Sequence, residues 1–324
     1  MSLESRMESF GRLCDRFPCD KPSWCVADYK IPDEQFKNLQ SAIAIYMSKG
    51  LPDQKLFTDD ESIMSEYERV RAIDRSLIKN CNPNGMLVPK KENSLEYNAV
   101  VKAYMEIMNT MNVRDLIPSY HVPLNMRYKD GIPRETDTTR VFATERTHSD
   151  SWAGETPISV TTIFSILGDT ENNFVKFYEP PSDFSEEWIR PLKGGYVEGE
   201  GIAAKYKPLD ITFRKGHVYL ADFANLHASR RNPGCRARVS IDTTFALMRS
   251  EEEMARAAAL EATGRTKERL SYDTLSQIGI SKAFYFPQSI HDPISATPLH
   301  KHSAILRLVD LESGTDLEDA EKLL

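Results

Sequence analysis

The first third of the chain carries apolar residues at helical spacing. In its clearest segment, Phe36, Leu39 and Ile43 recur every three or four positions, which places them on one face of a helix. The segments with this spacing are residues 34–48, 59–80 and 94–112. We therefore expect residues 1–118 to be mainly helical. Nothing on the apolar faces of these helices requires a cofactor, so we expect them to pack against a sheet.

Beyond residue 118 the pattern changes to short β-rich runs separated by turn residues. These runs are residues 124–128, 139–145, 158–167, 172–179, 203–213, 217–223 and 238–247. Such closely spaced short strands are typical of a sandwich or jelly roll and differ from an alternation of strands and helices. We expect residues 119–249 to form this β core.

A helical pattern returns near the C-terminus. Residues 250–264 begin with Ser and three acidic residues and end at Gly, and residues 271–279 suggest a second short helix. We therefore expect residues 250–324 to add C-terminal helices. At about 150 residues per domain the 324 residues allow one or two domains. Because we find no linker or repeat, we predict a single α+β domain over residues 1–324.

Composition and charge exclude several classes of protein. Hydrophobic residues make up 40% of the chain and charged residues 27%, which is typical of a packed globular protein. The net charge of −7 argues against nucleic acid as a partner. No apolar stretch approaches the ~20 residues of a membrane span, and no secretory signal is visible. We predict a cytoplasmic protein whose partner is a small molecule, and the sequence carries no signal for an oligomeric state.

The five cysteines do not form a recognisable metal or disulfide pattern. They are Cys14, Cys19, Cys25, Cys81 and Cys235. The first three are five and six positions apart, whereas zinc and iron–sulfur sites usually contain closer pairs. We interpret all five as structural thiols.

A candidate metal site begins at His148 and Asp150. On a strand, residues two positions apart point to the same face, so both could serve as ligands. The same segment is also compatible with a strand-to-loop transition. His227, just beyond the predicted strand 217–223, offers a second imidazole. Two histidines and one carboxylate form the facial triad of non-haem Fe(II) oxygenases.

The other histidines fit this site less well. His217 begins a predicted strand and is interpreted as a surface residue. His300 and His302 form a second pair without a nearby carboxylate, and we expect them at the surface. His121 is flanked by Pro118 and Pro123, and we interpret it as structural.

Arg238 follows His227 by eleven positions, and Ser240 lies two residues further on the same strand face. A guanidinium can hold a carboxylate through two parallel hydrogen bonds, and a neighbouring hydroxyl can add a third. Nearby arginines compete for this role, namely Arg230, Arg231 and Arg236. The spacing favours Arg238.

Together, "HSD" at 148–150, His227 and "RVS" at 238–240 resemble the HxD…H…RxS signature of Fe(II)/2-oxoglutarate-dependent oxygenases. The resemblance covers residues ~120–248 by the strand pattern. It implies a double-stranded β-helix, a jelly-roll or cupin-type core. It also implies that His148, Asp150 and His227 bind Fe(II), and that Arg238 and Ser240 bind the 2-oxoglutarate carboxylate. O2 would be the second cosubstrate. The halogenating branch has a small residue in place of Asp150, so the chain looks like an oxygenase.

A narrower likeness concerns the substrate. The segment HxDxWxG at 148–154 is similar to oxygenases of bacterial carbohydrate and aminoglycoside clusters, which implies a polar, sugar-like substrate or a natural-product intermediate. The implied reaction is hydroxylation with release of succinate and CO2. Desaturation, epimerisation and ring formation would use the same residues.

Four further residues are candidates near this site. Arg127 and Asn125 lie on the predicted strand before the HxD. They either belong to a solvated face of that strand or contact the cosubstrate or the substrate. Either Thr161 or Thr162 could face the cosubstrate, and we select Thr162. A hydroxyl buried in the core, without a role in binding, is an equally good interpretation. Trp152 suits packing or a lid, and an aromatic ring there could also stack on substrate.

Two other functions remain compatible with these residues. The first is a cupin-type metal enzyme that does not use 2-oxoglutarate, which predicts no succinate and no dependence on Arg238. The second is a non-catalytic jelly-roll protein that binds a small molecule, which predicts that His148→Ala leaves ligand binding intact.

Overall fold

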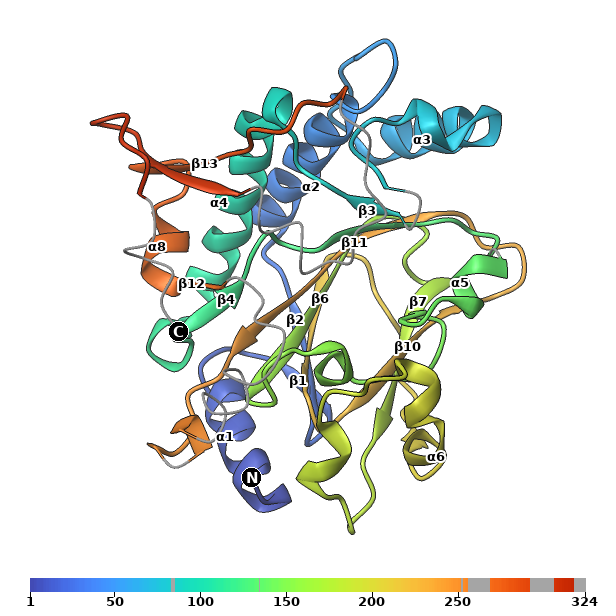
Figure 1. Ribbon diagram of the computed structural model, residues 1–324, viewed down its shortest axis with the longest axis vertical. Coiled ribbons are helices and arrows are strands. Elements are labelled where there is room, and N and C mark those ends of the chain that lie inside the picture. The colour runs from blue at the N-terminus through green and yellow to red at the C-terminus, as the bar shows by residue number, and fades with distance from the viewer. Residues whose placement is uncertain (83–84, 134, 252, 256–268, 292–305, 318–324) are drawn as a thin grey trace.

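The computed structural model describes residues 1–324 except 83–84, 134, 252, 256–268, 292–305 and 318–324 (Figure 1). Its described helices are α1 (Leu3–Cys14), α2 (Asp33–Ser48), α3 (Asp60–Ile73), α4 (Ser94–Thr110), α5 (Glu135–Thr139), α6 (Glu200–Ala203) and α8 (Tyr272–Ser276). Short 3-10 turns occur at Arg75–Leu77, Lys91–Asn93, Arg114–Leu116, Asp150–Ala153, Glu186–Ile189 and Tyr196–Gly199. None of the described helices combines the length and apolarity that crossing a membrane requires.

A large antiparallel sheet forms the centre of the molecule. Its strands follow the order β1-β2-β9-β6-β11-β4-β12, and β5 also pairs with β11 and with β3. The strands are β1 (Asp20–Ser23), β2 (Val26–Lys30), β3 (Met86–Leu87), β4 (Ser119–His121), β5 (Met126–Lys129), β6 (Ser159–Gly168), β9 (His217–Asp222), β11 (Arg238–Ala246) and β12 (Arg269–Ser271). The long β6 and β11 strands pair along almost their whole length, so they form the rigid middle of this sheet.

A smaller antiparallel sheet, β10-β7-β8, faces one side of the large one. It consists of β7 (Asn173–Glu179), β8 (Lys207–Pro208) and β10 (Leu226–Arg231). Val175 and Phe177 of β7 pack with Ile163 of β6 and Tyr219 of β9 in one buried apolar cluster. The surface of the large sheet that carries Ile163 is therefore its inner face, turned toward the second sheet.

The opposite, outer face of the large sheet is covered by helices. Figure 1 shows α2 and α4 lying side by side, with α3 near them above the sheet. Phe164 of β6 and Ile241 of β11 belong to the same buried cluster as Ile43 of α2 and Tyr104 of α4. The three helices predicted in the first third are confirmed, and so is their packing on a sheet.

Several predicted boundaries are wrong. The region expected to be helical also supplies β1 and β2, whose alternation is too short to be distinguished from loop in the sequence. Residues 139–145 form no strand, because Thr139 ends α5 and the rest form bends, turns and loop, and the only strand within residues 203–213 is the two-residue β8. The helix α1 lies within the region 1–118 that was expected to be mainly helical, although no separate segment was predicted for it.

The C-terminal region is mixed where the structure describes it. The short helix expected at 271–279 is confirmed as α8. Three strands are present beside it, β12 in the large sheet and the pair β13 (Lys282–Tyr285) and β14 (Arg307–Asp310). Most of the helix expected at 250–264 lies outside the described residues. The expectation of helices alone in this region is therefore wrong.

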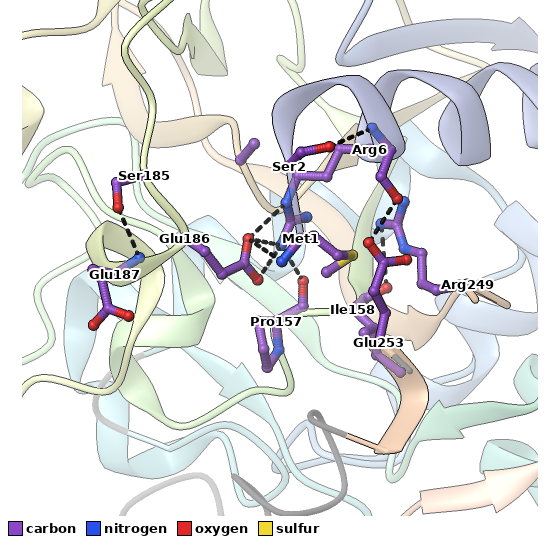
Figure 2. A network of polar contacts seen from close by, with 12 residues as sticks. Met1, Ser2, Arg6, Pro157, Ile158, Ser185, Glu186, Glu187, Arg249 and Glu253 are labelled. Atoms are coloured by element: carbon purple, nitrogen blue, oxygen red, sulfur yellow. Dashed lines mark hydrogen bonds and ion pairs between the residues drawn. The ribbon is translucent and has the colours of Figure 1, made fainter. Parts of the chain in front are cut away.

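A buried ion cluster connects α1 to the end of β9. Asp222 accepts hydrogen bonds from Arg6 Nη1 at 2.8 Å and from Arg249 Nη2 at 2.6 Å. The Arg6 guanidinium also pairs with Glu186 at 2.9 Å. In Figure 2, Glu186 and Arg249 lie on opposite sides of the Arg6 side chain. Asp222 Oδ1 further accepts the backbone N–H of Ala224, so the cluster holds the turn that leads from β9 into β10.

The five cysteines form no disulfide. Cys14, Cys25 and Cys81 are buried, and Cys19 and Cys235 are partly exposed. Burial raises the pKa of the Cys25 thiol to about 12, so this thiol stays neutral.

Candidate metal centre

His148 and His227 lie opposite each other on neighbouring segments. The backbone N–H of His148 donates to the His227 carbonyl at 2.9 Å, and that of His227 donates to the His148 carbonyl at 2.8 Å. This closed pair is an isolated antiparallel bridge. His227 lies within β10, which was not predicted; the sequence placed it just beyond the preceding strand. The bridge brings the two imidazole rings to a centroid separation of 4.3 Å.

Asp150 completes a cluster of three potential ligands. Its Oδ1 lies 3.8 Å from His148 Nε2 and its Oδ2 lies 3.8 Å from His227 Nε2. One potential ligand atom from each of the three residues lies within 4.8 Å of the other two. Within the described part of the chain, this is the cluster of His, Cys, Asp or Glu side chains close enough together to hold a metal ion. The structure thus brings together the three residues that the sequence singled out as candidate ligands. An ion with bonds of about 2.1 Å needs donors at roughly this spacing.

The local backbone differs from the expected strand. His148 makes only the bridge to His227, and Asp150 begins the 3-10 turn Asp150–Ala153, which ends at Gly154 with φ of 98°. The strand-to-loop alternative is therefore the one confirmed. Ser149 caps this turn by accepting the backbone N–H of Ser151, and its hydroxyl lies 3.4 Å from the Phe223 carbonyl. The turn directs Asp150 back toward the two imidazoles.

The surroundings of His148 hold it as a neutral ligand. Its Nδ1 lies 2.7 Å from the Arg146 carbonyl, which can only accept, so Nδ1–H donates and the Nε2 lone pair faces Asp150. Burial and the adjacent His227 hold the pKa of His148 well below its usual range. The Tyr196 ring stacks on the imidazole with centroids 4.0 Å apart. His148 is therefore oriented and uncharged before any ion binds.

Thr161 and Thr162 lie on opposite faces of β6. Thr161, on the inner face, donates from Oγ1 to Asp150 Oδ2 at 3.3 Å. Thr162 turns to the outer face, where its Oγ1 donates to the Thr243 carbonyl at 3.0 Å. The structure thus brings Thr161 to the cluster and does not bring Thr162, which had been selected from the sequence.

Arg238 lies on the inner face and is 2% exposed. Its Nη1 donates to the hydroxyl of Ser240, and Nε and Nη2 have no hydrogen-bond partner among the described residues. Arg236, the competitor on the same strand alternation, is exposed and pairs with Glu68 at 2.7 Å. Arg238 thus presents a buried guanidinium with free donors, which is costly without an anion.

The two remaining arginines near β10 are already engaged. Arg230 donates to the Glu145 carbonyl at 2.7 Å and to the Tyr178 hydroxyl at 2.9 Å. Arg231 donates to the Asp130 carbonyl at 2.8 Å. Arg238 is therefore the arginine of this group whose position suits an incoming carboxylate.

Further charged residues share the inner face with Arg238. Lys129 and Arg127 of β5 stand directly opposite Arg238 and Ser240 of β11. Burial lowers the pKa of Lys129 to about 8, and its Nζ donates to Thr144 Oγ1 at 2.6 Å. Arg127 Nε lies 3.4 Å from Asp242 Oδ2, and the contact of Arg127 with cosubstrate or substrate stays a prediction.

Asn125 and Trp152 are both buried, so neither lies on a solvated strand face. The Asn125 carbonyl accepts the backbone N–H of Asp242 at 2.7 Å. Trp152 is 1% exposed, and its Nε1 donates to the Trp188 carbonyl at 2.6 Å. It packs with Tyr196 in a buried cluster, and this favours its interpretation as a packing residue over stacking on substrate.

Tyr196 was not identified from the sequence. It belongs to the segment between β7 and β8, and its backbone N–H donates to the Val141 carbonyl at 3.0 Å. Gly199, three residues later, packs so closely on the Trp152 ring that an added Cβ would overlap it. The glycines around Tyr196, in "KGGYVEGEG", indicate close packing, but the sequence does not show which residues pack against them.

The interpretation of His217 as a surface residue is wrong. His217 is 9% exposed, and its Nδ1 lies 2.6 Å from Asp28 Oδ1. A buried imidazole beside a carboxylate is stabilised by that pairing, and no spacing in the sequence indicated Asp28. His121 is buried and lies 3.4 Å from Glu155, in agreement with a structural role. His300 and His302 lie outside the described residues.

Comparison with known proteins gives distant similarities of structure. No protein-family model and no curated protein sequence matches the chain. A solved structure of SnoN, described as a non-heme alpha ketoglutarate dependent epimerase from nogalamycin biosynthesis, is 12% identical over 74% of this chain and 82% of its own, with a TM-score of 0.37. An N-substituted L-amino acid dioxygenase from Burkholderia ambifaria is 14% identical over 76% and 89%, with a TM-score of 0.37.

Another solved structure of SnoN is described as a complex with Fe3+, alpha ketoglutarate and nogalamycin RO. It is 11% identical over 74% of this chain and 84% of its own, with a TM-score of 0.32. Because these TM-scores are low, we base the function on the residues of the site.

Proposed function

We propose that this protein is an Fe(II)- and 2-oxoglutarate-dependent oxygenase that acts on a polar small molecule. The observation that carries the proposal is the convergence of His148 Nε2, Asp150 and His227 Nε2 within 4.8 Å. Two imidazoles and one carboxylate leave coordination positions open, which suits non-haem Fe(II) with a chelating cosubstrate. The neutral state of His148 supports a ligand role, because a protonated imidazole cannot bind a cation.

Arg238 supports 2-oxoglutarate as the cosubstrate. It is a buried cation with a hydroxyl beside it, and two of its nitrogen atoms have no partner in the part of the chain that the structure describes. A carboxylate brought in by the cosubstrate would satisfy these donors in a bidentate arrangement. A cupin-type enzyme that does not use 2-oxoglutarate would leave these buried donors without a partner.

The topology supports a double-stranded β-helix. Four strands of the large sheet, in the order β9-β6-β11-β5, face the sheet β10-β7-β8, and all pairs are antiparallel. The bridge between His148 and His227 extends the smaller sheet by one more segment at the metal centre. Two facing antiparallel sheets of this kind are typical of jelly rolls.

When bound, iron and 2-oxoglutarate supply the oxidation of a substrate C–H bond by O2, with release of succinate and CO2. The protein orients and shields these groups. The Arg146 carbonyl fixes the His148 tautomer, and Thr161 donates to the Asp150 oxygen that faces His227. Tyr196 covers one side of the His148 ring and restricts the access of water to it.

The proposal is tested by adding Fe(II) and 2-oxoglutarate under anaerobic conditions and recording the visible charge-transfer band of the chelate. We expect a band in the wild-type protein that is weakened in Asp150→Ala and in Arg238→Ala. A wild-type protein that shows no band at saturation contradicts the proposal. A band that persists unchanged in Arg238→Ala would favour a metal enzyme with another cosubstrate.

A further inference from the structure

Asp242 is an acidic residue on the inner face of β11, close to the candidate metal centre. It stands directly opposite Ile163 of β6, which packs between the two sheets. Two residues further along β11, Thr244 stands opposite Thr161, the residue that donates to Asp150. Because side chains two apart on a strand share a face, Asp242 faces the same interior as the triad.

One oxygen of Asp242 is buried without a partner. Its Oδ2 lies 3.4 Å from Arg127 Nε, an ion pair that does not reach hydrogen-bond geometry. Its Oδ1 is buried and accepts no hydrogen bond from the described residues. The side chain as a whole is 18% exposed, so the carboxylate remains reachable. An unpartnered buried carboxylate oxygen is costly unless a donor arrives from outside the chain.

The cosubstrate cannot be that donor. An ionised carboxylate only accepts hydrogen bonds, and 2-oxoglutarate presents carboxylates and a keto oxygen, which also accept. The donors suited to the cosubstrate, Arg238 and Ser240, lie four and two residues before Asp242 on the same face of β11, so cosubstrate and Asp242 would share one interior. A donor for Asp242 Oδ1 therefore comes from water or from the second substrate, and a substrate donor that displaces water would be recognised by its hydrogen bond.

We propose that Asp242 is a specificity-determining residue that accepts a hydrogen bond from an ammonium or hydroxyl group of the substrate. This inference rests on the proposed function and narrows its substrate class to polar molecules with such a donor. The ion pair with Arg127 holds the Asp242 side chain in place on the inner face. An ammonium group would gain from the full negative charge, whereas a hydroxyl would need only the acceptor.

The test uses three matched probes, because the substrate is unidentified. Glucosamine, glucose and 2-deoxyglucose place an ammonium, a hydroxyl and no donor at one position of the same sugar ring. Each is added to protein loaded with Mn(II) and 2-oxoglutarate near pH 6.5, where the amine of glucosamine is protonated. The readout is the enhanced relaxation of the probe protons by Mn(II), which reports binding next to the metal.

We expect glucosamine or glucose to bind the wild-type protein more tightly than 2-deoxyglucose. In Asp242→Asn the preference for glucosamine should fall about tenfold or more, because a charge-assisted hydrogen bond is lost. Loss of glucosamine binding in Asp242→Asn with retention of glucose binding identifies an ammonium, because the amide oxygen of Asn still accepts from a hydroxyl. Loss of the preference for glucose only in Asp242→Leu, which has no acceptor, identifies a hydroxyl. No enhancement by any probe, or the same preference in the wild type and both variants, overturns the inference.

Two controls separate this inference from the proposed function. Asp210→Asn makes the same change of charge at an exposed aspartate and should behave as the wild type. The anaerobic Fe(II)–2-oxoglutarate band should persist in Asp242→Asn, which also shows that the variant folds. Absence of the band in the wild-type protein would contradict the oxygenase itself, whereas an intact band with unchanged probe preference contradicts only the role of Asp242.

Discussion

The main chains of His148 and His227 are hydrogen-bonded to each other in both directions, at 2.9 and 2.8 Å. This bridge joins two residues that are 79 positions apart and sets the separation of their rings. A facial triad depends on such backbone contacts, because side-chain flexibility alone would let the ligands separate. The bridge therefore sets the separation of the two imidazoles through the main chain.

Thr161 and Thr162 provide a test of the ligand geometry with a built-in control. Thr161→Val removes the hydrogen bond to Asp150, so we expect metal affinity to fall by about 10- to 100-fold, as for other partners of metal ligands. Thr162→Val removes a hydrogen bond on the outer face and should lower the free energy of unfolding by about 1 kcal/mol. Titration with Fe(II) should show no change for Thr162→Val. Equal weakening by both variants would contradict the assigned faces of β6.

Arg238 should determine affinity for 2-oxoglutarate. Arg238→Ala removes charge-assisted hydrogen bonds, and we expect the dissociation constant of 2-oxoglutarate to rise by about 10- to 100-fold. Arg238→Lys keeps the charge without the planar fork and should give an intermediate value. Isothermal titration in the presence of Mn(II) measures these constants. Arg236→Ala, which removes an exposed partner of Glu68, should leave the affinity unchanged.

The contact between Gly199 and Trp152 should be required for stability. A Cβ at Gly199 overlaps the Trp152 ring, so we expect Gly199→Ala to cost about 1–3 kcal/mol of unfolding free energy. Gly201 is the matched control, because a Cβ there meets nothing within 4 Å. Gly201→Ala lies in α6 and should be neutral or stabilising by about 0.5–1 kcal/mol. Urea denaturation distinguishes the two, and equal stability of both variants would refute the close approach.

Asp222 should make stability depend on pH in the acid range. Burial alone would raise its pKa, but Arg6 and Arg249 outweigh burial and hold the folded-state pKa below the usual value. The stabilisation is therefore fully present above about pH 4, the usual carboxyl pKa. It is lost as pH falls through the lower folded-state pKa, where the folded protein must take up a proton.

The corresponding variant is Asp222→Asn. It breaks a buried ion pair and should lower the free energy of unfolding at neutral pH by about 3–5 kcal/mol. Denaturation at a series of pH values should show this difference shrinking below about pH 4. A difference that stays constant down to acid unfolding would exclude Asp222 as the titrating group. The exposed Asp210→Asn serves as the control for charge.

Local spacing along the chain was sufficient for much of the fold. The helical periodicity predicted α2, α3 and α4, and the β-rich runs between turn residues predicted β6 and β11, the two longest strands. These elements are long, so their patterns repeat often enough to be distinguished from chance. The spacing of His148, Asp150, His227 and Arg238 likewise identified candidate ligands, because the chemistry restricts the residue types.

The remaining features depended on contacts between distant segments. Only the pairing of strands decided that Thr161 rather than Thr162 faces Asp150, since adjacent residues on a strand take opposite faces and the sequence does not say which face is inner. Several buried contacts join residues that lie far apart in the sequence. They are the ion pair of Asp222 with Arg6, the stacking of Tyr196 on His148 and the contact of His217 with Asp28. The chain could supply the residue types of a site, whereas their distances, orientation and burial arose only when the two sheets and the helices packed together.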